Sequence, residues 1–441
     1  MDDNVSNIKK IAQLMAELAE QLEICTHCGM CQAFCPLFAQ TGFESDVARG
    51  KLALLDGLTH ELFKSPEGVC ERLNKCLLCG SCEFNCPRGT NVLEIFLKAR
   101  VILTGFIGLS PVKKTVLRRI LARPKTFDRL VKLASKFQNI FTRPASEPVG
   151  ISCRKFALPL RQERNFVSIA PAPFHHMAPS LRTTSGSSGI KVAFFVGCLI
   201  DKIFPDVAKA VLKVLDYHGV GVFMPEGQGC CGIPAVSSGD AVAFNRLIRH
   251  NLDIFEAADF DYLVTACATC TFTIKKIWPM MIQMMVRKES ANIKSRVRKI
   301  AEKTLDINQF LVSKIGLQNG VSGRDAKAVS VTYHDPCHLK KSLGISSEPR
   351  ALIKANPLYR FTEMPEADVC CGMGGSFNLQ YYNISTKIGR QKYNNIKISG
   401  CSTVATGCPA CMIQISDMIS RLGGHIAVKH PVEIYAESLK N

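Results

Sequence analysis

A five-cysteine unit that occurs twice constrains this chain more than any other feature of its sequence. Each copy contains a lone cysteine, a Cys-Cys-Gly triplet and a Cys-x-x-Cys pair, and matching cysteines lie 139 to 141 residues apart. This constancy indicates internal duplication of one structural unit. Adjacent thiols suit a cluster of several irons better than a single tetrahedral ion, so each copy, or the pair together, is predicted to hold an iron–sulfur cluster of unusual type. The cysteines are Cys198, Cys230, Cys231, Cys267 and Cys270 in the first copy and Cys337, Cys370, Cys371, Cys408 and Cys411 in the second.

Two further cysteine runs precede the duplicated unit. They read Cys25-x2-Cys28-x2-Cys31-x3-Cys35-Pro36 and Cys76-x2-Cys79-x2-Cys82-x3-Cys86-Pro87. In bacterial ferredoxins with this spacing, the fourth cysteine of each run ligates the cluster of the other run. A zinc site would instead show paired Cys-x-x-Cys or Cys/His sets. The spacing therefore predicts two [4Fe-4S] clusters, the first held by Cys25, Cys28, Cys31 and Cys86, and the second by Cys76, Cys79, Cys82 and Cys35.

The composition favours a cytoplasmic protein of two or three domains. The chain has 441 residues, of which 47% are hydrophobic and 21% charged, as in ordinary soluble proteins. Its 21 cysteines are odd in number and clustered, which argues against a disulfide framework and favours a reducing compartment. No secretory leader is visible. The net charge of +18 is not accompanied by a nucleic-acid motif, so we expect no nucleic-acid partner.

Much of the positive charge follows an apolar stretch at residues 101–112. That stretch is shorter than the ~20 residues needed to cross a bilayer. The basic run over residues 113–143 reads as a solvated helical face or a partner surface. A peripheral contact with the cytoplasmic face of a membrane is the alternative.

Hydrophobic periodicity predicts an α+β multidomain architecture. An all-helical ferredoxin domain is expected over 1–142, a proline-rich linker over 143–190, and two duplicated α/β cysteine-rich lobes over 191–320 and 321–441. Within the lobes, nearly every cysteine follows a predicted strand and precedes a predicted helix. Ligands bind at that edge of open α/β sheets, where helix N-termini favour anions.

Together these motifs resemble the cysteine-rich, or CCG-domain, family of iron–sulfur subunits. That family includes iron–sulfur subunits of glycolate oxidase and D-lactate dehydrogenase, the iron–sulfur (C) subunit of anaerobic glycerol-3-phosphate dehydrogenase, lactate-utilisation proteins and the catalytic subunit of heterodisulfide reductase. The likeness to the glycolate and lactate enzymes is strongest at Cys28-Gly-Met-Cys31, Asp46-Val-Ala-Arg-Gly50-Lys and Cys76-Leu-Leu-Cys79-Gly-Ser-Cys82. Many glycolate oxidase subunits lack some cysteines of the second motif. This chain keeps all ten, as heterodisulfide reductase does, so the resemblance implies one or two additional clusters of the noncubane [4Fe-4S] type.

The resemblance implies a function in electron transfer. The chain has neither a dinucleotide-binding glycine motif nor a P-loop, so we expect no flavin or nicotinamide on the chain itself. The family implies a subunit that relays electrons from a partner FAD-binding 2-hydroxyacid (D-lactate or glycolate) dehydrogenase to a quinone or a soluble carrier. A heterodisulfide-reductase-like catalytic subunit and the iron–sulfur (C) subunit of a glycerol-3-phosphate dehydrogenase are the alternatives. No catalytic residue can be named, although His334 and His338 beside Cys337 suggest either proton transfer or local hydrogen bonding.

Overall fold

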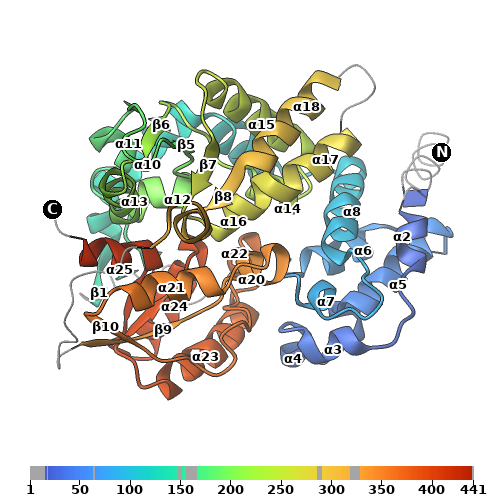
Figure 1. Cartoon of the computed structure of the whole chain (residues 1–441). Helices are drawn as coiled ribbons and strands as arrows, with labels where there is room; N and C mark the ends of the chain where they lie inside the picture. Colours follow the sequence, from blue (N-terminus) through green and yellow to red (C-terminus); the bar gives the residue numbers. More distant parts are fainter. Residues whose placement is uncertain are drawn as a thin grey trace.

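The computed structural model describes residues 15–16, 18–62, 65–146, 151–154, 166–285, 291–317 and 328–439. In Figure 1 a helical N-terminal region lies beside two α/β lobes, as the α+β prediction requires. Most of the amphipathic pattern that begins the chain, the side chain of Cys153 and the predicted boundary at 320/321 lie outside the described residues.

The N-terminal region is helical throughout its described residues before 142. Leucines at helical spacing on α5, Leu52, Leu55 and Leu58, are buried in an apolar core, and α5 packs against α2, α3 and α6. The elements are α2 (Ala19–Glu23), α3 (Met30–Phe34), α4 (Phe38–Thr41), the 3-10 helix η1 (Glu44–Asp46), α5 (Ala48–Thr59), α6 (Glu67–Asn74), α7 (Ser81–Phe84), α8 (Val92–Ile107), α9 (Pro111–Thr115), the π-helix η2 (Val116–Leu121) and α10 (Pro124–Phe141).

The segment that follows, predicted as a linker, contains short regular elements. Strands β1 (Thr142–Ser146), β2 (Ile151–Arg154) and β3 (Phe166–Val167) form an antiparallel sheet. After α11 (Phe174–Met177), strand β4 (Leu181–Arg182) pairs with a strand of the first lobe. Ser188 Oγ then donates to the Gly219 carbonyl at 2.8 Å. The end of this segment therefore lies along the sheet of the first lobe. The edge strand of that sheet, β4, precedes residue 191 in the sequence.

The first lobe contains a five-stranded sheet in the order β4-β6-β5-β7-β8, parallel except for β4. Its core strands are almost wholly buried, which explains their continuous apolar sequence. The elements are β5 (Lys191–Phe194), α12 (Cys198–Lys202), α13 (Pro205–Tyr217), β6 (Gly221–Met224), α14 (Ile233–Ser237), α15 (Ala241–Phe255), β7 (Tyr262–Thr265), α16 (Ala268–Phe272), η4 (Thr273–Ile277), α17 (Trp278–Met285), α18 (Ala291–Lys303), β8 (Thr304–Asp306), α19 (Ile307–Phe310) and η6 (Leu311–Ile315).

The second lobe repeats the parallel part of that topology. Its sheet order, β10-β9-β11-β12, corresponds strand by strand to β6-β5-β7-β8. The duplication of sequence is therefore a duplication of fold. The elements are β9 (Val329–Tyr333), α20 (Cys337–Leu343), α21 (Ser347–Ala355), β10 (Tyr359–Phe361), α22 (Ser376–Gln380), α23 (Tyr382–Ile398), β11 (Thr403–Ala405), α24 (Pro409–Arg421), β12 (Ala427–Lys429) and α25 (Pro431–Ser438).

The three parts share extensive contacts. Helix α25 packs on α13 of the first lobe, where His218 Nε2 and Tyr435 Oη lie 3.0 Å apart. Helix α8 packs against α14, and buried Arg100 donates to the Ser237 carbonyl at 2.7 Å. One apolar core runs from the helical region through the first lobe to α25.

Candidate metal centres

The ten cysteines of the duplicated unit lie at the carboxyl ends of parallel strands. In the first lobe they follow β5, β6 and β7, and in the second lobe they follow β9, β10 and β11. Three loops of each sheet therefore bring five thiols to one edge, where the sequence had predicted them. Nine of the ten are buried, and Cys198 is partly buried.

Within the first lobe the thiols form a chain of contacts. The Sγ atoms of Cys198 and Cys230 lie 3.9 Å apart. Cys231 is in hydrogen-bond contact with Cys230 and Cys270, and Cys270 with Cys267. The thiols of the second lobe form the matching series of contacts. It runs from Cys337 through Cys370, Cys371 and Cys411 to Cys408.

The two chains of thiols meet. Cys267 of the first lobe contacts Cys408 of the second. Beside them, the backbone N–H of Ala268 donates to the Gly407 carbonyl at 3.0 Å. Ten thiols thus form one connected group across the interface between the lobes, an arrangement that suits several irons and not one tetrahedral ion.

The glycine of each Cys-Cys-Gly triplet is required by the shape of the loop. Gly232 and Gly372 have φ of 97° and 91°, and each donates its N–H to the preceding Cys230 or Cys370 sulfur at 3.4 Å. A Cβ at Gly232 would lie 2.6 Å from the Phe244 ring, and one at Gly372 would lie 2.7 Å from the Ser385 carbonyl oxygen. Only glycine combines this conformation with so little space.

The contacts among the thiols shift their pKa values in both directions. Hydrogen bonds to neighbouring thiols, together with burial, raise the pKa of Cys230, Cys270, Cys370 and Cys411 well above its usual value. Neighbouring thiols donate to Cys231 and Cys371 and lower the pKa of each well below its usual value. Lys392, whose side chain is almost wholly buried, lies near Cys371, Cys337 and Cys370. Burial lowers the pKa of Lys392, while the nearby thiols oppose that shift. Closely spaced cysteines with a lysine beside them fit an iron–sulfur cluster, which binds its cysteine ligands as thiolates.

The ferredoxin-type cysteines gather into the two predicted sets. One cavity is lined by Cys25, Cys28, Cys31 and Cys86, and a second by Cys35, Cys76, Cys79 and Cys82. Cys82 also reaches the wall of the first cavity. The fourth cysteine of each run therefore lies with the other run, so the four thiols around each cavity suit a [4Fe-4S] cluster. Iron ligation by these residues stays a prediction.

The second of these sets continues into the second lobe. Cys79 is in contact with Cys370, and this contact, partly offset by burial and aided by the Lys341 charge, lowers the pKa of Cys79 to about 5. The Lys341 ammonium donates to Ser81 Oγ at 2.7 Å at the same junction. An unbroken series of thiols therefore runs from the helical region through both lobes to Cys198.

The two histidines beside Cys337 have different surroundings. His338 lies 3.2 Å from Thr269 Oγ1 and 3.1 Å from the Leu78 carbonyl oxygen, so it holds the helical region and both lobes together. His334 is fully buried, with Nδ1 3.1 Å from the Ala367 carbonyl oxygen. A ring nitrogen of His334 and the sulfurs of Cys371 and Cys411 lie within 4.8 Å of one another. His338 is therefore a structural residue, while His334 faces the candidate metal centre.

Sequence reasoning missed the residues that hold the first Cys-Cys-Gly loop. Asn251, fully buried on α15, donates to the Cys230 carbonyl and accepts from the Gly229 N–H, both at 3.0 Å. The Trp278 indole N–H donates to the Cys231 carbonyl at 2.8 Å. A lone asparagine or tryptophan on a helix carries no motif, so only the fold reveals these partners.

Comparison with known proteins agrees with this arrangement. Residues 192–275 and 331–416 match the cysteine-rich domain (CCG) family, and residues 21–90 match the 4Fe-4S dicluster domain family. Lactate utilization protein A of Exiguobacterium sp. is 31% identical over 251 residues, which cover 56% of this chain and 98% of that protein. The chain belongs to the CCG-domain family of iron–sulfur proteins.

Other members of the CCG-domain family differ in how much of this chain they match. The probable glycolate oxidase iron-sulfur subunit of Bacillus subtilis is 27% identical over 443 residues, 98% of each chain. The B subunit of the fumarate reductase (CoM/CoB) of Methanothermobacter marburgensis is 31% identical over 65% of this chain and 55% of its own length. The predicted family, its 4Fe-4S dicluster domain and its two cysteine-rich domains are therefore confirmed.

Proposed function

We propose that this chain is the electron-transfer subunit of a flavin-dependent 2-hydroxyacid dehydrogenase that oxidises D-lactate or glycolate. A partner FAD-binding subunit oxidises the hydroxyacid, and this chain takes the electrons to a quinone or a soluble carrier. The names of the glycolate oxidase and lactate utilization relatives support the substrate class.

The observation that carries the proposal is the unbroken series of thiols. Contacts between Cys79 and Cys370, and between Cys267 and Cys408, connect the ferredoxin-type cysteines to both lobes. If each set holds a cluster, the clusters are neighbours along this series. Each iron–sulfur cluster carries one electron at a time. A chain without a flavin motif therefore needs such clusters to take the two electrons of a hydroxyacid one after the other.

We assign all eighteen motif cysteines as ligands. Cys25, Cys28, Cys31 and Cys86 would hold one [4Fe-4S] cluster and Cys76, Cys79, Cys82 and Cys35 the other. The five thiols of each lobe would hold one further noncubane cluster. The three other cysteines contribute none. Of these, Cys401 is buried and Cys70 accepts a hydrogen bond from Asn74 at 3.4 Å.

Anaerobic purification with any bound partner tests this assignment. We expect a co-purifying FAD subunit, hydroxyacid-dependent reduction of the clusters seen by EPR, and about sixteen irons per chain at four per cluster. Cys267→Ser should lower the iron content by about four, whereas Cys70→Ser should leave it unchanged. About eight irons would show that the lobes are empty, and loss of hydroxyacid-dependent reduction would overturn the function.

A second function is favoured by the completeness of both cysteine sets. Ten closely connected thiols are more than a subunit that only transfers electrons needs. In addition, the fumarate reductase relative carries CoM/CoB in its name. A heterodisulfide-reductase-like chain would reduce a disulfide at one lobe. Reduction of a heterodisulfide by the isolated reduced chain would support this function over the first.

We also propose a peripheral contact with the cytoplasmic face of a membrane through α10. No helix among the described residues has the length and apolar character needed to cross a bilayer. Exposed residues of α10 include Arg129, Lys132 and Lys136 together with Leu130 and Leu133. Basic side chains beside exposed leucines suit an anionic lipid surface.

A further inference from the structure

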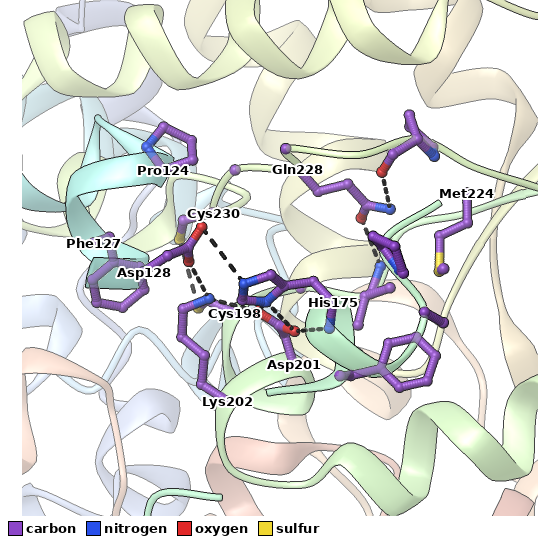
Figure 2. A pocket seen from close by; sticks show the side chains of 18 of the residues that line it. Pro124, Phe127, Asp128, His175, Cys198, Asp201, Lys202, Met224, Gln228 and Cys230 are labelled. Carbon is purple, nitrogen blue, oxygen red and sulfur yellow. Dashed lines mark hydrogen bonds and ion pairs between the residues drawn. The ribbon is translucent and has the colours of Figure 1, made fainter. Parts of the chain in front are cut away.

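A hollow that is partly open to solvent lies beside the cysteines of the first lobe. Helices α10, α11 and α12 supply one side, and the loop after β6 supplies the other. Cys198 and Cys230 form part of its wall, as Figure 2 shows. These two thiols lie at the far end of the series that begins in the helical region, so the hollow meets the end of the proposed electron path.

Four charged or titratable side chains form a network at one end of the hollow. His175 Nδ1 lies 2.8 Å from an Asp201 carboxylate oxygen, and the His175 backbone N–H donates to Asp201 at 2.9 Å. Lys202 Nζ lies 2.6 Å from Asp128 and 2.5 Å from Asp201. In Figure 2 these groups point toward one another from three different helices.

The network is an ion pair that orients a histidine. Burial raises the pKa of Asp201, but the hydrogen bond from His175 and the charge of Lys202 outweigh it and lower that pKa. Burial lowers the pKa of Lys202, but Asp201 and Asp128 outweigh it and raise that pKa. The ammonium of Lys202 pairs with both carboxylates, so a divalent cation there would face a positive charge at hydrogen-bond distance from its ligands.

One edge of the network faces the hollow and can bind a ligand. His175 Nε2 lies 3.9 Å from Asp128, too far for a hydrogen bond, and the side chain is 31% exposed. Asp201 accepts from Nδ1, which leaves Nε2 to face a ligand. Apolar side chains complete the wall, namely Pro124, Phe127, Phe174 and Met224. Apolar walls with a polar group at one end suit a small planar ring that bears a carbonyl oxygen.

We propose that this hollow binds the ring of a quinone, with one carbonyl oxygen accepting a hydrogen bond from the Nε2–H of a doubly protonated His175 ring, whose Nδ1–H donates to Asp201. This inference rests on the proposed function and names the site of its acceptor. Reduction of a quinone to a quinol takes up two electrons and two protons and converts two C=O groups into C–OH groups. Under the proposed function the electrons come from iron–sulfur clusters. His175 donates one proton, and solvent at the open side supplies the other and reprotonates the ring.

The way into the hollow agrees with a lipid-soluble ligand. Pro124, Phe127 and Asp128 line the hollow from the first turns of α10. The next turns of α10 expose Leu130 by 42% and Leu133 by 53%. The helix proposed to contact the membrane therefore also forms a wall of the hollow, and a quinone can pass from lipid to the site along one element.

Photolabelling of the full chain with an azidoquinone tests the binding site without requiring turnover. We expect label on α10 or α11, competed by unlabelled ubiquinone-1. Ala178→Trp fills the hollow from its lining and should lower labelling at least tenfold, while Met177→Trp, exposed next to it, should not. Label elsewhere, or equal labelling of both variants, would overturn the proposal. The proposal would also be overturned if a disulfide protected the hollow from labelling at a lower concentration than ubiquinone-1 does.

A second experiment tests the role of His175. The iron-loaded chain, reduced with dithionite, is mixed with ubiquinone-1, and quinol formation is measured. His175→Leu should slow quinol formation at least tenfold, and exposed His176→Leu should leave it unchanged. This assay needs no flavin partner. If hydroxyacid fails to reduce the clusters but quinone still binds the hollow, only the proposed function fails. If the clusters are reduced but label misses the hollow, only this inference fails.

Discussion

His334 is the clearest difference between the two duplicated sites at the scale of single residues. The corresponding residue of the first lobe, 139 positions earlier, is Phe195. His334 lies against Cys371 and adds to the lowering of that thiol's pKa, after Cys370 and Cys411. Hydrogen bonds to cluster sulfurs raise reduction potentials, so the second site should have the higher potential.

We expect His334→Phe to lower the reduction potential of the second-lobe centre. A loss of roughly 1.4 kcal/mol of stabilisation corresponds to about 60 mV for one electron. An EPR-monitored redox titration measures the shift. Exposed His425→Phe is the matched control and should leave all potentials unchanged. An unchanged or raised potential in His334→Phe would contradict the assigned hydrogen bond.

Asp306 makes the stability of the first lobe depend on pH. Burial raises its pKa to about 7, although it accepts hydrogen bonds from the Asn308 backbone at 2.9 Å and side chain at 2.7 Å. The unfolded chain has a pKa of about 3.9 at this group. Between these values only the folded chain keeps the proton, so its stability falls as pH rises from about 4 to about 7.

Asp306→Asn should remove this part of the pH dependence. The amide oxygen can still accept from the Asn308 N–H, and no proton is released. In anaerobic urea unfolding, the urea concentration at the midpoint should therefore fall less between pH 5 and pH 8 for the variant than for the natural chain. Exposed Asp216→Asn should keep the full fall. Equal slopes for all three proteins would show that Asp306 is ionised in the fold.

The grouping of the ferredoxin-type cysteines around two cavities could be predicted because the spacing of the first three cysteines in each run is local information. Three cysteines spaced by two residues can face one cluster wherever the loop lies, so the sets around Cys28 and Cys79 needed no knowledge of the fold. The contact between Cys79 and Cys370 depends on how two domains pack, which spacing does not record. The Asp128–His175–Asp201–Lys202 network was missed for the same reason. His175 lies in a segment predicted as a linker, and Asp128 lies in one interpreted only by its charge.

At the scale of elements, α10 combines two roles that its sequence pattern could not separate. Its first turns line the hollow, and its later turns expose cationic and apolar side chains. Only part of the basic run is free for an external surface. Upstream on η2, Arg118 pairs with Asp240 at 2.9 Å, so this arginine joins the run to the first lobe.

Charge reversal on α10 tests membrane contact. Replacing Arg129, Lys132 and Lys136 by Glu should lower binding to vesicles containing phosphatidylserine by at least about 100-fold, since each basic residue contributes about 1 kcal/mol and the new carboxylates repel the lipid surface. The same reversal at Lys387, Arg390 and Lys397, exposed on α23, changes the net charge equally and should have little effect. Vesicle co-sedimentation measures both. An equal loss in the two triple variants would indicate non-specific attraction.

At the scale of the whole molecule, the helical region and the first lobe share one apolar core. A Cβ at Gly239 would lie 2.2 Å from Thr104 Oγ1 and 2.4 Å from the Arg100 carbonyl oxygen of α8. This close approach has no sequence signature beyond a single glycine, and it holds α8 of the helical region against the first lobe.

Gly239→Ala should force α8 away from the first lobe and uncouple their unfolding. We expect calorimetry to show one transition for these two parts in the natural chain, and an earlier, split transition in the variant, with a loss of roughly 1–3 kcal/mol from overpacking. Gly105→Ala, one residue from Thr104 on α8 with open space around it, should keep the single transition. Two transitions in the natural chain would contradict the shared core.

The packing of α25 on α13 also bears on how the protein is made. The first lobe leaves the ribosome long before residues 431–438 exist, so α13 lacks its cover and Cys267 lacks its neighbour Cys408 during synthesis. The ferredoxin-type cysteines all precede residue 90, so both of their sets are complete early in synthesis, although Cys79 still lacks its neighbour Cys370. We therefore expect iron to enter the N-terminal sites of a nascent chain first. A ribosome-arrested chain ending near residue 330 should acquire cubane-type EPR signals but no signal from the lobes.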